Sequence, residues 1–525
     1  MNIHFTLPLL NQQKPAFKQR QTNPAGNKFE KSPSQDSFEM SIGYVNDLHG
    51  QTNNMMRILS GIKGDLRLSG GDNDIGDEKN KAVHNTTVKF LNLADVKATA
   101  LGNHELDTTQ KDSIDTINGL NGDVLAVNFR KDSLENQSDD DIEEFDRADL
   151  DNYIKKSKVV EVNGEKIGII GATPIDLTLR ITHPEYHKDC SADGLDDTIE
   201  EIQEEIENFK EQGINKIVLV SHLGLDTDKI VALNTDGIDV IIGGHTHELI
   251  RDIKEGENLL YSKSGEPVII TEAGKNGNHF GKLNLTFDKD GVITRAQNNL
   301  GETSKFHRNM INQYIFNTIL GKPEQVGYIK SVVAPPKSLI EENAHANFMC
   351  DAMKVEMQAD IGLWNNSGTR SYFQPGVIDS RDIKDIAPFE DRISVADVSE
   401  KTLVDMFKHA IDATYTTQGN KPGLIAVSGL EYTVNPQRGA LVGMSFVDKD
   451  GVKHKIDVNN PSEDKTYKVV TDSFIMSSGA DLDVLCPKGE CEEYPFNKDF
   501  LTCEYIKHLD KPVEINQLGR IHFEN

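Results

Sequence analysis

Side chains that bind divalent metal ions follow five short apolar runs, at the point where each run gives way to polar, glycine-rich sequence. Carboxylate, imidazole and amide groups are ligands that such ions take in proteins. The residues are, in chain order, Asp47, His49, Asp72, Asn103, His104, His222, His245 and His247. A single histidine after an apolar run is usually a packed or surface residue, but the repetition at five run ends predicts a metal site built from five segments.

The donor set favours a pair of ions that act in catalysis. It contains no cysteine, which disfavours a structural zinc site or a redox centre, and it suits Mn²⁺, Zn²⁺, Co²⁺ or Fe²⁺. Without His104, seven ligands remain. Seven are too many for one ion but suit two, and two ions about 3.5–4 Å apart need a shared ligand such as Asp72. Such a pair lowers the pKa of a shared water molecule and neutralises charge on a phosphoryl group, so the sequence predicts hydrolysis of a phosphate ester.

His104 and Asp107 form a second candidate feature. Asp107 lies three residues after His104, so both share a face if this segment is helical. The carboxylate would then hold the imidazole in one tautomer and favour its protonated form. A protonated imidazole can stabilise phosphoryl oxygens or protonate the leaving group. The alternative is that Asp107 only caps or solvates the helix; we favour the catalytic pair.

The elements that must position these residues are buried strands. The five apolar runs cover residues 41–45, 65–68, 96–101, 214–220 and 238–242. Helical sequence lies between them: residues 197–212 place Ile199, Ile202, Ile206 and Phe209 on one face, and Asp196 or Asp197 is expected to cap this helix. Alternating strands and helices predict an α/β fold, in which the carboxyl ends of the strands form a ligand crevice.

Composition limits the class of protein. The chain has 525 residues, with 56 Lys and Arg against 84 Asp and Glu, for a net charge of −28. So acidic a surface disfavours binding to polymeric nucleic acid but not to a small phosphate-bearing substrate. A membrane-spanning helix needs about 18 consecutive apolar residues, and no apolar run in this sequence approaches that length. Five cysteines exclude a disulfide scaffold, although Cys486 and Cys491 could close a small disulfide loop.

The composition and the apolar pattern of the chain change at several places. Residues 1–40 are predicted to be a flexible leader, 41–299 a first domain, 300–335 a helical linker or hinge, and 336–525 a second domain. Residues 132–151 hold ten Asp or Glu and are predicted to be a solvated insertion loop or an exposed helix rather than an acidic binding site.

The motifs at the run ends resemble those of calcineurin-like metallophosphoesterases, and more narrowly those of the 5′-nucleotidase family. The resemblance rests on Asn46–Gly50, Gly71-Asp72, Gly102–Asp107, Ser221-His222 and Gly243–His247. It implies a four-layer α/β sandwich as the first domain and a smaller α/β (α+β) substrate domain after it. It further implies that one ion is held by Asp47, His49, Asp72 and His247, that the other is held by Asp72, Asn103, His222 and His245, and that His104 and Asp107 are catalytic.

The resemblance also extends to the second half of the chain. There it implies a substrate site in which Arg370 binds a phosphate and Phe389 and Phe474 stack on a nucleobase, with Asn365 and Gly429 in further pocket segments. Stacking of this kind contributes about 1–3 kcal/mol per base. For either phenylalanine alone, ordinary core packing is the default reading.

Three positions depart from the family pattern. Glu341 stands where many members carry an arginine, and Asp391 stands where an asparagine is frequent. Ala480 replaces the carboxylate that grips the ribose hydroxyls, unless Asp481 takes over that role. The hydrolytic residues are therefore complete, whereas the pocket that selects the nucleotide is altered.

The resulting expectation is a two-metal phosphohydrolase that acts on nucleoside 5′-monophosphates or related nucleotides, as a monomer or weak homodimer. Alternatives on the same metal site are a 2′,3′-cyclic nucleotide phosphodiesterase, a nucleotide-sugar hydrolase or the thiosulfohydrolase branch of the family. A non-catalytic nucleotide-binding surface protein is disfavoured because no ligand is missing. The family resemblance implies a periplasmic or cell-surface location, but residues 1–40 show no export signal, so a cytoplasmic location stays open.

Overall fold

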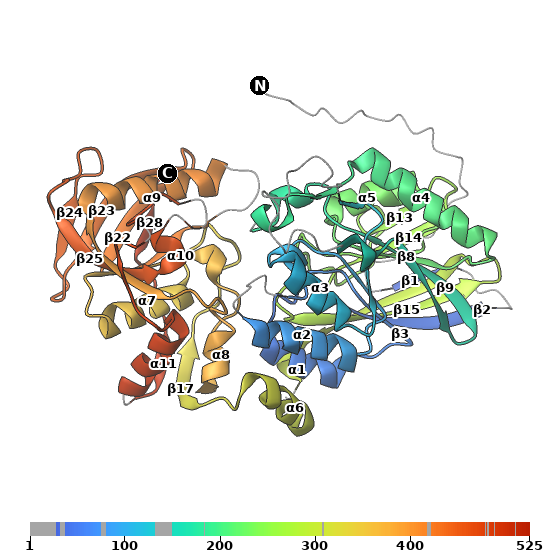
Figure 1. Cartoon of the computed structure of the whole chain (residues 1–525), viewed down its shortest axis with the longest axis horizontal. Helices are drawn as coiled ribbons and strands as arrows, with labels where there is room; N and C mark the ends of the chain where they lie inside the picture. The colour runs from blue at the N-terminus through green and yellow to red at the C-terminus, as the bar shows by residue number, and fades with distance from the viewer. Residues whose placement is uncertain are drawn as a thin grey trace, which may run out of the picture.

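The computed structural model describes residues 28–31, 37–74, 80–131, 150–182, 184–306, 309–416, 422–477, 479, 482–487, 489–509 and 511–524. The chain forms two α/β bodies side by side, with the N-terminal body drawn in blue to green and the C-terminal body in yellow to red (Figure 1). The acidic stretch at 132–149, most of the leader, and Ala480 and Asp481 lie outside the described residues. The two-domain α/β architecture predicted from the sequence is confirmed.

Two sheets pack face to face in the first domain. The larger has the strand order β1 (Lys28–Glu30), β16 (Ile293–Glu302), β15 (His279–Asp288), β2 (Ser37–Val45), β3 (Leu66–Ser69), β4 (Ala98–Ala100), β5 (Asp123–Leu125), β7 (Ile154–Lys155). The smaller has the order β13 (Leu259–Tyr261), β14 (Pro267–Thr271), β12 (Val240–Ile242), β11 (Ile217–Ser221), β9 (Glu165–Ala172), β8 (Ser157–Val162). A separate two-stranded antiparallel sheet pairs β6 (Phe129–Lys131) with β10 (Cys190–Ala192).

Helices cover the outer face of each sheet and complete the four layers. On the larger sheet lie α1 (Thr52–Gly61), α2 (Lys81–Leu93), α3 (Gln110–Asn118) and α6 (Met310–Leu320); on the smaller lie α4 (Leu195–Glu211) and α5 (Leu225–Asn234). The core between the sheets comes from alternating strand residues such as Ile42, Leu68 and Val240, all fully buried. Separate clusters under the helices, around Phe90 and Ile206, bind the outer layers to the sheets.

The second domain holds three smaller sheets around one core. Their orders are β19 (Gly376–Asp379), β17 (Gln325–Val332), β27 (Val513–Ile515); β21 (Ile425–Ser428), β18 (Ile361–Asn365), β25 (Thr466–Asp472), β20 (Ile393–Ser399), β26 (Glu492–Glu493); and β24 (Lys453–Ile456), β23 (Ala440–Val447), β22 (Leu430–Asn435), β28 (Ile521–Phe523). The helices are α7 (Ala344–Glu356), α8 (Ser380–Lys384), α9 (Glu400–Thr416), α10 (Ser473–Met476) and α11 (Lys498–His508). None of the described helices has the length and apolarity that a membrane crossing needs.

Three local expectations change. Part of the leader is ordered in the sheet, because Phe29 is buried against the core and β1 pairs with β16. The range 300–335 contains α6 and also β17, which pairs with β19 and β27 of the second domain. Neither Asp196 nor Asp197 caps α4: Gly194 occupies the N-cap position without a side-chain hydrogen bond, and the two aspartates lie in the first turn, where the helix dipole favours acidic side chains. Cys486 and Cys491 are free thiols.

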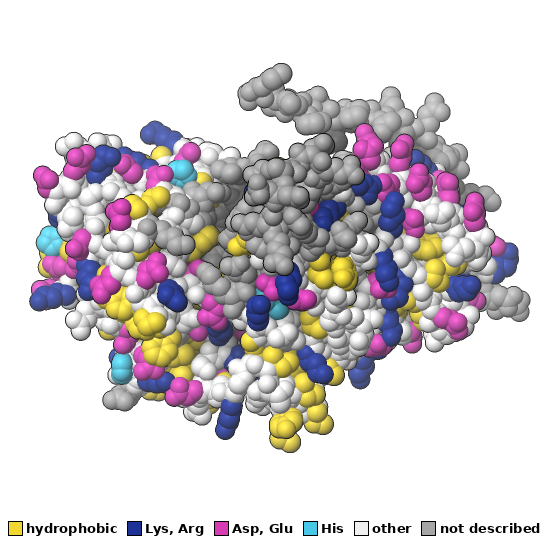
Figure 2. Space-filling model, in the orientation of Figure 1, with side chains coloured by type: hydrophobic (Ala, Val, Ile, Leu, Met, Phe, Trp, Pro, Cys, Tyr) yellow, Lys and Arg dark blue, Asp and Glu magenta, His cyan; other side chains and the backbone are white. Residues whose placement is uncertain are grey.

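The surface agrees with the net charge. Glu200, Glu204 and Glu207 on α4 are exposed, and Asp and Glu side chains gather along this helix on the visible face (Figure 2). The buried face of α4 is the one predicted from the sequence, since Ile202, Ile206 and Phe209 are buried.

Candidate functional site

In the first domain, the carboxyl ends of parallel strands from both sheets lie close together. Strands β2, β3 and β4 are parallel neighbours in the larger sheet, and β11 and β12 are parallel neighbours in the smaller one. The loops after these five strands carry the eight side chains that the sequence singled out. Because the two sheets pack face to face, loops from both contribute to a single cluster.

The side chains form three overlapping groups that could hold an ion. In each group the ligand atoms lie within 4.8 Å of one another. The groups are Asp47, His49 and His247; His49, Asp72 and His104; and Asp72, His222 and His245. Asp72 belongs to two of them, and its Oδ2 lies 3.1 Å from His222 Nε2 and 3.6 Å from His49 Nε2. This central position is what a carboxylate shared by two ions requires.

The backbone of these loops takes conformations that side chains usually avoid. Of the nine non-glycine residues in the described chain that have a positive φ, five are in this cluster: Asp47, His49, Asp72, His245 and His247. Such conformations cost of order 1–3 kcal/mol each and persist where surrounding contacts hold them. Glycines allow the loops to approach closely. A Cβ on Gly102 would lie 2.1 Å from Asp72 Oδ1, and one on Gly244 would lie 2.6 Å from the Gly70 carbonyl oxygen.

Hydrogen bonds behind the ligands orient them toward a common centre. His49 Nδ1 pairs with Asn276 Oδ1 at 2.9 Å, and His222 Nδ1 pairs with the Gly70 carbonyl oxygen at 2.6 Å. The Asn103 amide nitrogen donates to the Arg180 carbonyl oxygen. His49 Nε2 and Asn103 Oδ1 are then buried without a hydrogen-bond partner among the described residues. Buried polar atoms are normally satisfied, so these atoms fit the role of ligands to a cation.

The electrostatics of the cluster also favour a cation. Burial would raise the pKa of Asp47, but the neighbouring His247, His222 and His49 outweigh it and lower this pKa to about 2. Burial lowers the pKa of His49 to about 4, so its imidazole is neutral at pH 7. Burial would likewise lower the pKa of His222, but the charge of Asp72 outweighs it and raises this pKa to about 10. The carboxylate charges that stabilise a proton on His222 would attract a divalent ion in the same way.

His104 and Asp107 form the pair that their spacing predicted. His104 begins a short 3₁₀ helix, His104–Leu106, and its Nδ1 lies 2.5 Å from Asp107 Oδ2. The Thr182 backbone N–H donates to the other oxygen of Asp107. Burial lowers the pKa of His104, but the charges of Asp72 and Asp107 outweigh it and raise this pKa to about 9. His104 Nε2 remains available and lies 3.9 Å from Asp72 Oδ2, so geometry alone admits His104 as an acid or as a ligand.

Arg370 of the second domain faces this cluster. Its positive charge acts on both His49 and His104, where it disfavours the protonated imidazole. Burial lowers the pKa of Arg370 itself, and the charges of Asp107 and Asp72 only partly oppose this. Its Nε is buried without a hydrogen-bond partner among the described residues. Its guanidinium carbon lies 5.2 Å from the centre of the Phe389 ring. A cation and an aromatic ring therefore adjoin the candidate metal site from the other domain.

Four of the five predicted substrate residues share one edge of the second domain. β18 and β25 are parallel, so Asn365 at the end of β18 and Phe474 just after β25 lie at the same edge, and Phe389 precedes the antiparallel β20 there. Phe474 is 37% exposed, so part of its surface is open to a ligand. Asn365 is buried and donates to Ser367 Oγ within its own loop.

Gly429 does not share that edge, and its assignment to the pocket is corrected. β21 runs antiparallel to β18, pairing Ile425 with Asn365 and Ser428 with Gly362. Gly429 therefore lies at the opposite end of β18, where a Cβ would be 2.1 Å from the Asp360 carbonyl oxygen. Five residues of strand span about 16 Å. The glycine beside the Asn365 loop is Gly423, whose added Cβ would meet Asn366.

Several residues at the site were missed in the sequence. Glu105 is half-buried against the ligand loops and accepts hydrogen bonds from the backbone N–H groups of Asp72, Asn73 and Gly102. Its place directly after His104 was the available signal. Asn276 orients His49. Burial and the charge of Arg370 lower the pKa of the neighbouring Lys275, and the charge of Asp47 only partly opposes this. Both follow β14, a sixth strand end that the sequence reading passed over.

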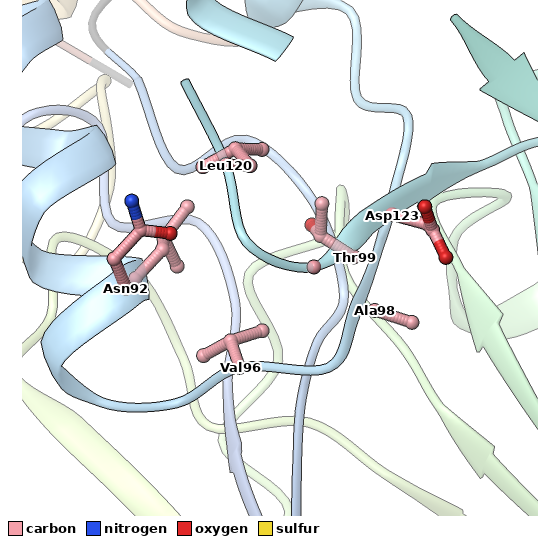
Figure 3. Close-up of a pocket in the computed structure, with 8 residues that line it drawn as sticks. Asn92, Val96, Ala98, Thr99, Leu120 and Asp123 are labelled. Atoms are coloured by element: carbon pink, nitrogen blue, oxygen red, sulfur yellow. The ribbon is translucent and has the colours of Figure 1, made fainter. Parts of the chain in front are cut away.

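The small pocket drawn in Figure 3 is not the candidate site. It has a volume of about 10 Å³ and is lined by residues that include Val96, Ala98, Leu120 and Asp123. These residues lie at or before the first residues of β4 and β5, whereas the ligand cluster lies beyond the last residues of the strands. The volume suffices for about one water molecule and excludes a nucleotide.

Comparison with known families matches both halves of the chain. Residues 40–249 match the model of the calcineurin-like phosphoesterases, and residues 325–485 match that of the 5′-nucleotidase C-terminal domain. The first match contains all seven candidate metal ligands together with His104 and Asp107. The second contains Asn365, Arg370, Phe389 and Phe474.

Individual relatives agree with these matches. The chain is 24% identical over 536 residues to the "trifunctional nucleotide phosphoesterase protein YfkN" of Bacillus subtilis, covering 93% of this chain but only 35% of that protein. It is 27% identical over 473 residues to a 5′-nucleotidase of Diplobatis ommata, covering 83% of this chain and 77% of the relative. The fold is similar to that of a 5′-nucleotidase precursor of Thermus thermophilus, with a TM-score of 0.65, 22% identity and coverage of 93% and 100%.

Proposed function

The chain belongs to the proteins that join a calcineurin-like phosphoesterase domain to a 5′-nucleotidase C-terminal domain, and from this premise we propose that it hydrolyses the phosphate ester of nucleoside 5′-monophosphates. The observation that carries the proposal is the place of Arg370. It brings a half-buried cation and the adjoining Phe389 ring from the second domain to the metal-ligand cluster of the first. A phosphate bound to such a centre has its nucleoside directed toward the second domain.

The fold implies divalent metal ions, and the donor set supports two, with Mn²⁺, Zn²⁺ or Co²⁺ as the proposed identities. Asp47, His49, Asp72 and His247 would hold one ion, and Asp72, Asn103, His222 and His245 the other. When bound, the ions supply Lewis-acid polarisation of the phosphate and activation of a water molecule. The hydrogen bonds to Asn276 and to the Gly70 carbonyl oxygen orient the imidazoles of His49 and His222 before an ion binds.

The remaining steps belong to side chains of the chain itself. Arg370 binds a phosphate oxygen through its guanidinium, which pairs well with phosphate. The charge of Asp107 favours the imidazolium form of His104, whose Nε2–H can donate to the phosphoryl oxygen or to the leaving oxygen. Phe389 and Phe474 offer rings at one edge of the second domain for stacking on the base.

A substrate panel tests the proposal. Phosphate release is measured with 5′-AMP, 2′,3′-cyclic AMP and UDP-glucose in the presence of Mn²⁺ or Co²⁺, and we expect 5′-AMP to give the highest kcat/KM. A higher value for the cyclic or sugar nucleotide would replace the proposal by one of those activities on the same metal site. Bound metal without hydrolysis of any of the three would favour a nucleotide-binding protein without catalysis.

Discrimination between ribose and deoxyribose is expected to be weak. Ala480, which lies outside the described residues, stands where the resemblance places a carboxylate that grips the ribose hydroxyls. Without that acceptor, loss of the 2′-hydroxyl costs little binding energy. We expect kcat/KM for 5′-AMP and 5′-dAMP to lie within about tenfold of each other. A ribose preference of a hundredfold would contradict this and would point to Asp481 as the substitute, which Asp481→Ala would then test.

Arg370→Ala is expected to raise KM for 5′-AMP by at least about tenfold, or roughly 1.4 kcal/mol of binding, since it removes a charge-assisted bond to phosphate. Steady-state kinetics measure the effect. Arg438→Ala is the matched control, because Arg438 is an exposed arginine on the loop between β22 and β23 of the same domain. An unchanged KM in Arg370→Ala would remove this residue from the substrate site.

A further inference from the structure

A carboxylate of the second domain caps a helix of the first. Asp385 follows α8 and is only 6% exposed. Its Oδ2 accepts a hydrogen bond from the Asn53 backbone N–H at 3.0 Å, and its Oδ1 accepts one from Thr52 Oγ1 at 3.1 Å. Thr52 and Asn53 are the first two residues of α1, so both carboxylate oxygens serve the N-terminus of a helix in the other domain.

Helix α1 has no cap of its own. The side chain of its N-cap residue, Gln51, makes no capping hydrogen bond, and its first turn contains no acidic residue. Gln51 donates instead to the Asp385 carbonyl oxygen at 2.9 Å. An N-terminal cap stabilises a helix by about 0.5–2 kcal/mol, and a carboxylate gains further from the helix dipole. The contact between the domains therefore satisfies donors that α1 leaves open.

The segment that begins at Asp385 also carries the substrate residues. The Arg370 backbone N–H donates to the carbonyl oxygen of Ile386, the residue after Asp385. Asn80, the N-cap of α2, donates from its side chain to the Pro388 carbonyl oxygen at 3.0 Å. Phe389 comes next. The segment is thus fixed to the first domain at α1 and at α2, and Arg370 is attached between the two points. Helix α8 lies beside α1 and α2 (Figure 1).

The N-terminus of α1, to which this segment is anchored, adjoins the metal loop in sequence. Gln51 comes two residues after His49, and α1 begins directly after Gln51. One hydrogen-bonded connection therefore runs from the loop that carries Asp47 and His49, through Asp385 and Ile386, to Arg370. Its expected effect is to set the position of the Arg370 guanidinium relative to the ligands.

We propose that Asp385 is a positioning residue of the composite site, and that by capping α1 it holds Arg370 against the metal-ligand cluster of the first domain. This inference rests on the proposed function for its kinetic consequence, but its structural consequence is independent of that function. Removal of the cap should shift the molecule toward a form in which the two domains are apart.

Kinetics of Asp385→Ala provide the first test. The assay is run at pH 8.0, roughly one unit above the value of about 7 to which burial raises the pKa of this carboxyl group, so that Asp385 is ionised. We expect kcat/KM for 5′-AMP to fall about tenfold or more, because two hydrogen bonds to a charged group are lost. Thr52→Val, which removes one of the two donors from the other side, should produce a smaller loss of about threefold. Unchanged values in both variants would overturn the proposal.

A double-mutant cycle separates positioning from loss of stability. If Asp385 acts through Arg370, then Asp385→Ala should change kcat/KM less than about twofold in an Arg370→Ala background. Fully additive losses would overturn a positioning role. Asp457→Ala is the matched control, since Asp457 accepts two backbone hydrogen bonds, from Asn459 and Asn460, entirely within the second domain. It should leave kcat/KM within about twofold of the parent.

Small-angle X-ray scattering provides a test that does not depend on nucleotide hydrolysis. With Mn²⁺ and inorganic phosphate present, the parent should scatter as the compact two-domain form and Asp385→Ala as a more extended one. Identical curves would overturn the capping role even if the kinetics changed. If the parent hydrolyses no nucleotide, the proposed function fails, while an extended form of Asp385→Ala would still support the cap between domains.

Discussion

Asp72→Asn is expected to eliminate phosphate release and to reduce bound metal in the same preparation. The substitution keeps the shape of the side chain and an acceptor for the His104 backbone N–H, which donates to Asp72 Oδ1 at 3.0 Å. It removes the charge of the carboxylate that lies between the two candidate ion positions. Mutation of residues that only hydrogen-bond to a metal ligand typically lowers metal affinity about 10–100-fold. Loss of the charge of a shared ligand should therefore lower it by more than about 100-fold.

Elemental analysis of the purified protein and a phosphate-release assay measure both effects. Asp65→Asn is the matched control. Asp65 comes directly before β3, at the opposite end of that strand from Asp72, and accepts two hydrogen bonds from Ser41. Asp65→Asn should keep two ions per chain. A single ion per chain in the active parent, or two ions in Asp72→Asn, would refute the shared-carboxylate assignment.

His104→Ala should lower turnover by about 10²–10⁴-fold while both metal ions stay bound. The physical reason is loss of a proton donor whose tautomer and charge are set by Asp107. His454→Ala is the matched control, since His454 forms a comparable pair with Asp448 at 2.7 Å on an exposed strand of the second domain. We expect its turnover to lie within about twofold of the parent.

The metal content of His104→Ala decides between the two roles that the geometry admits. Loss of one ion per chain would make His104 a ligand and would contradict the catalytic assignment. Asp107→Asn adds a second readout. Removing the anion lowers the pKa of His104, so the imidazolium is lost at lower pH, and the alkaline limb of the turnover profile should move toward lower pH.

Most of the candidate site in the first domain could be predicted from the sequence, because it depends on local sequence patterns. The residues after an apolar strand in an α/β protein lie at the crevice whatever the details of packing, so Asp47, Asp72 and His222 could be grouped from the strand ends alone. The spacing of His104 and Asp107 likewise determined their contact, since three residues of helical backbone bring side chains together. The amphipathic face of α4 followed from its period in the same way.

The second domain was less predictable because its pocket depends on strand direction. Ser428-Gly429 resembles a pocket motif, but the antiparallel pairing of β21 with β18 places Gly429 at the far end and Gly423 beside the Asn365 loop. Nothing in the local sequence gives the direction in which β21 pairs. The same holds for β1, which joins the first sheet through Phe29 although its surroundings read as a polar leader.

What the sequence determined by itself is thus the chemistry of the candidate site: the donor types, their order, and the two-domain α/β fold that presents them. Only the tertiary structure supplied the groups that orient these donors, since Asn276 meets His49 across 227 residues and Asp385 meets Asn53 across 332. The physical reason is that a strand end or a helical turn fixes neighbours through backbone geometry, whereas contacts between distant segments depend on how whole sheets and domains pack. The approach of Arg370 to Asp72 is of this second kind, because it exists only where the two domains meet.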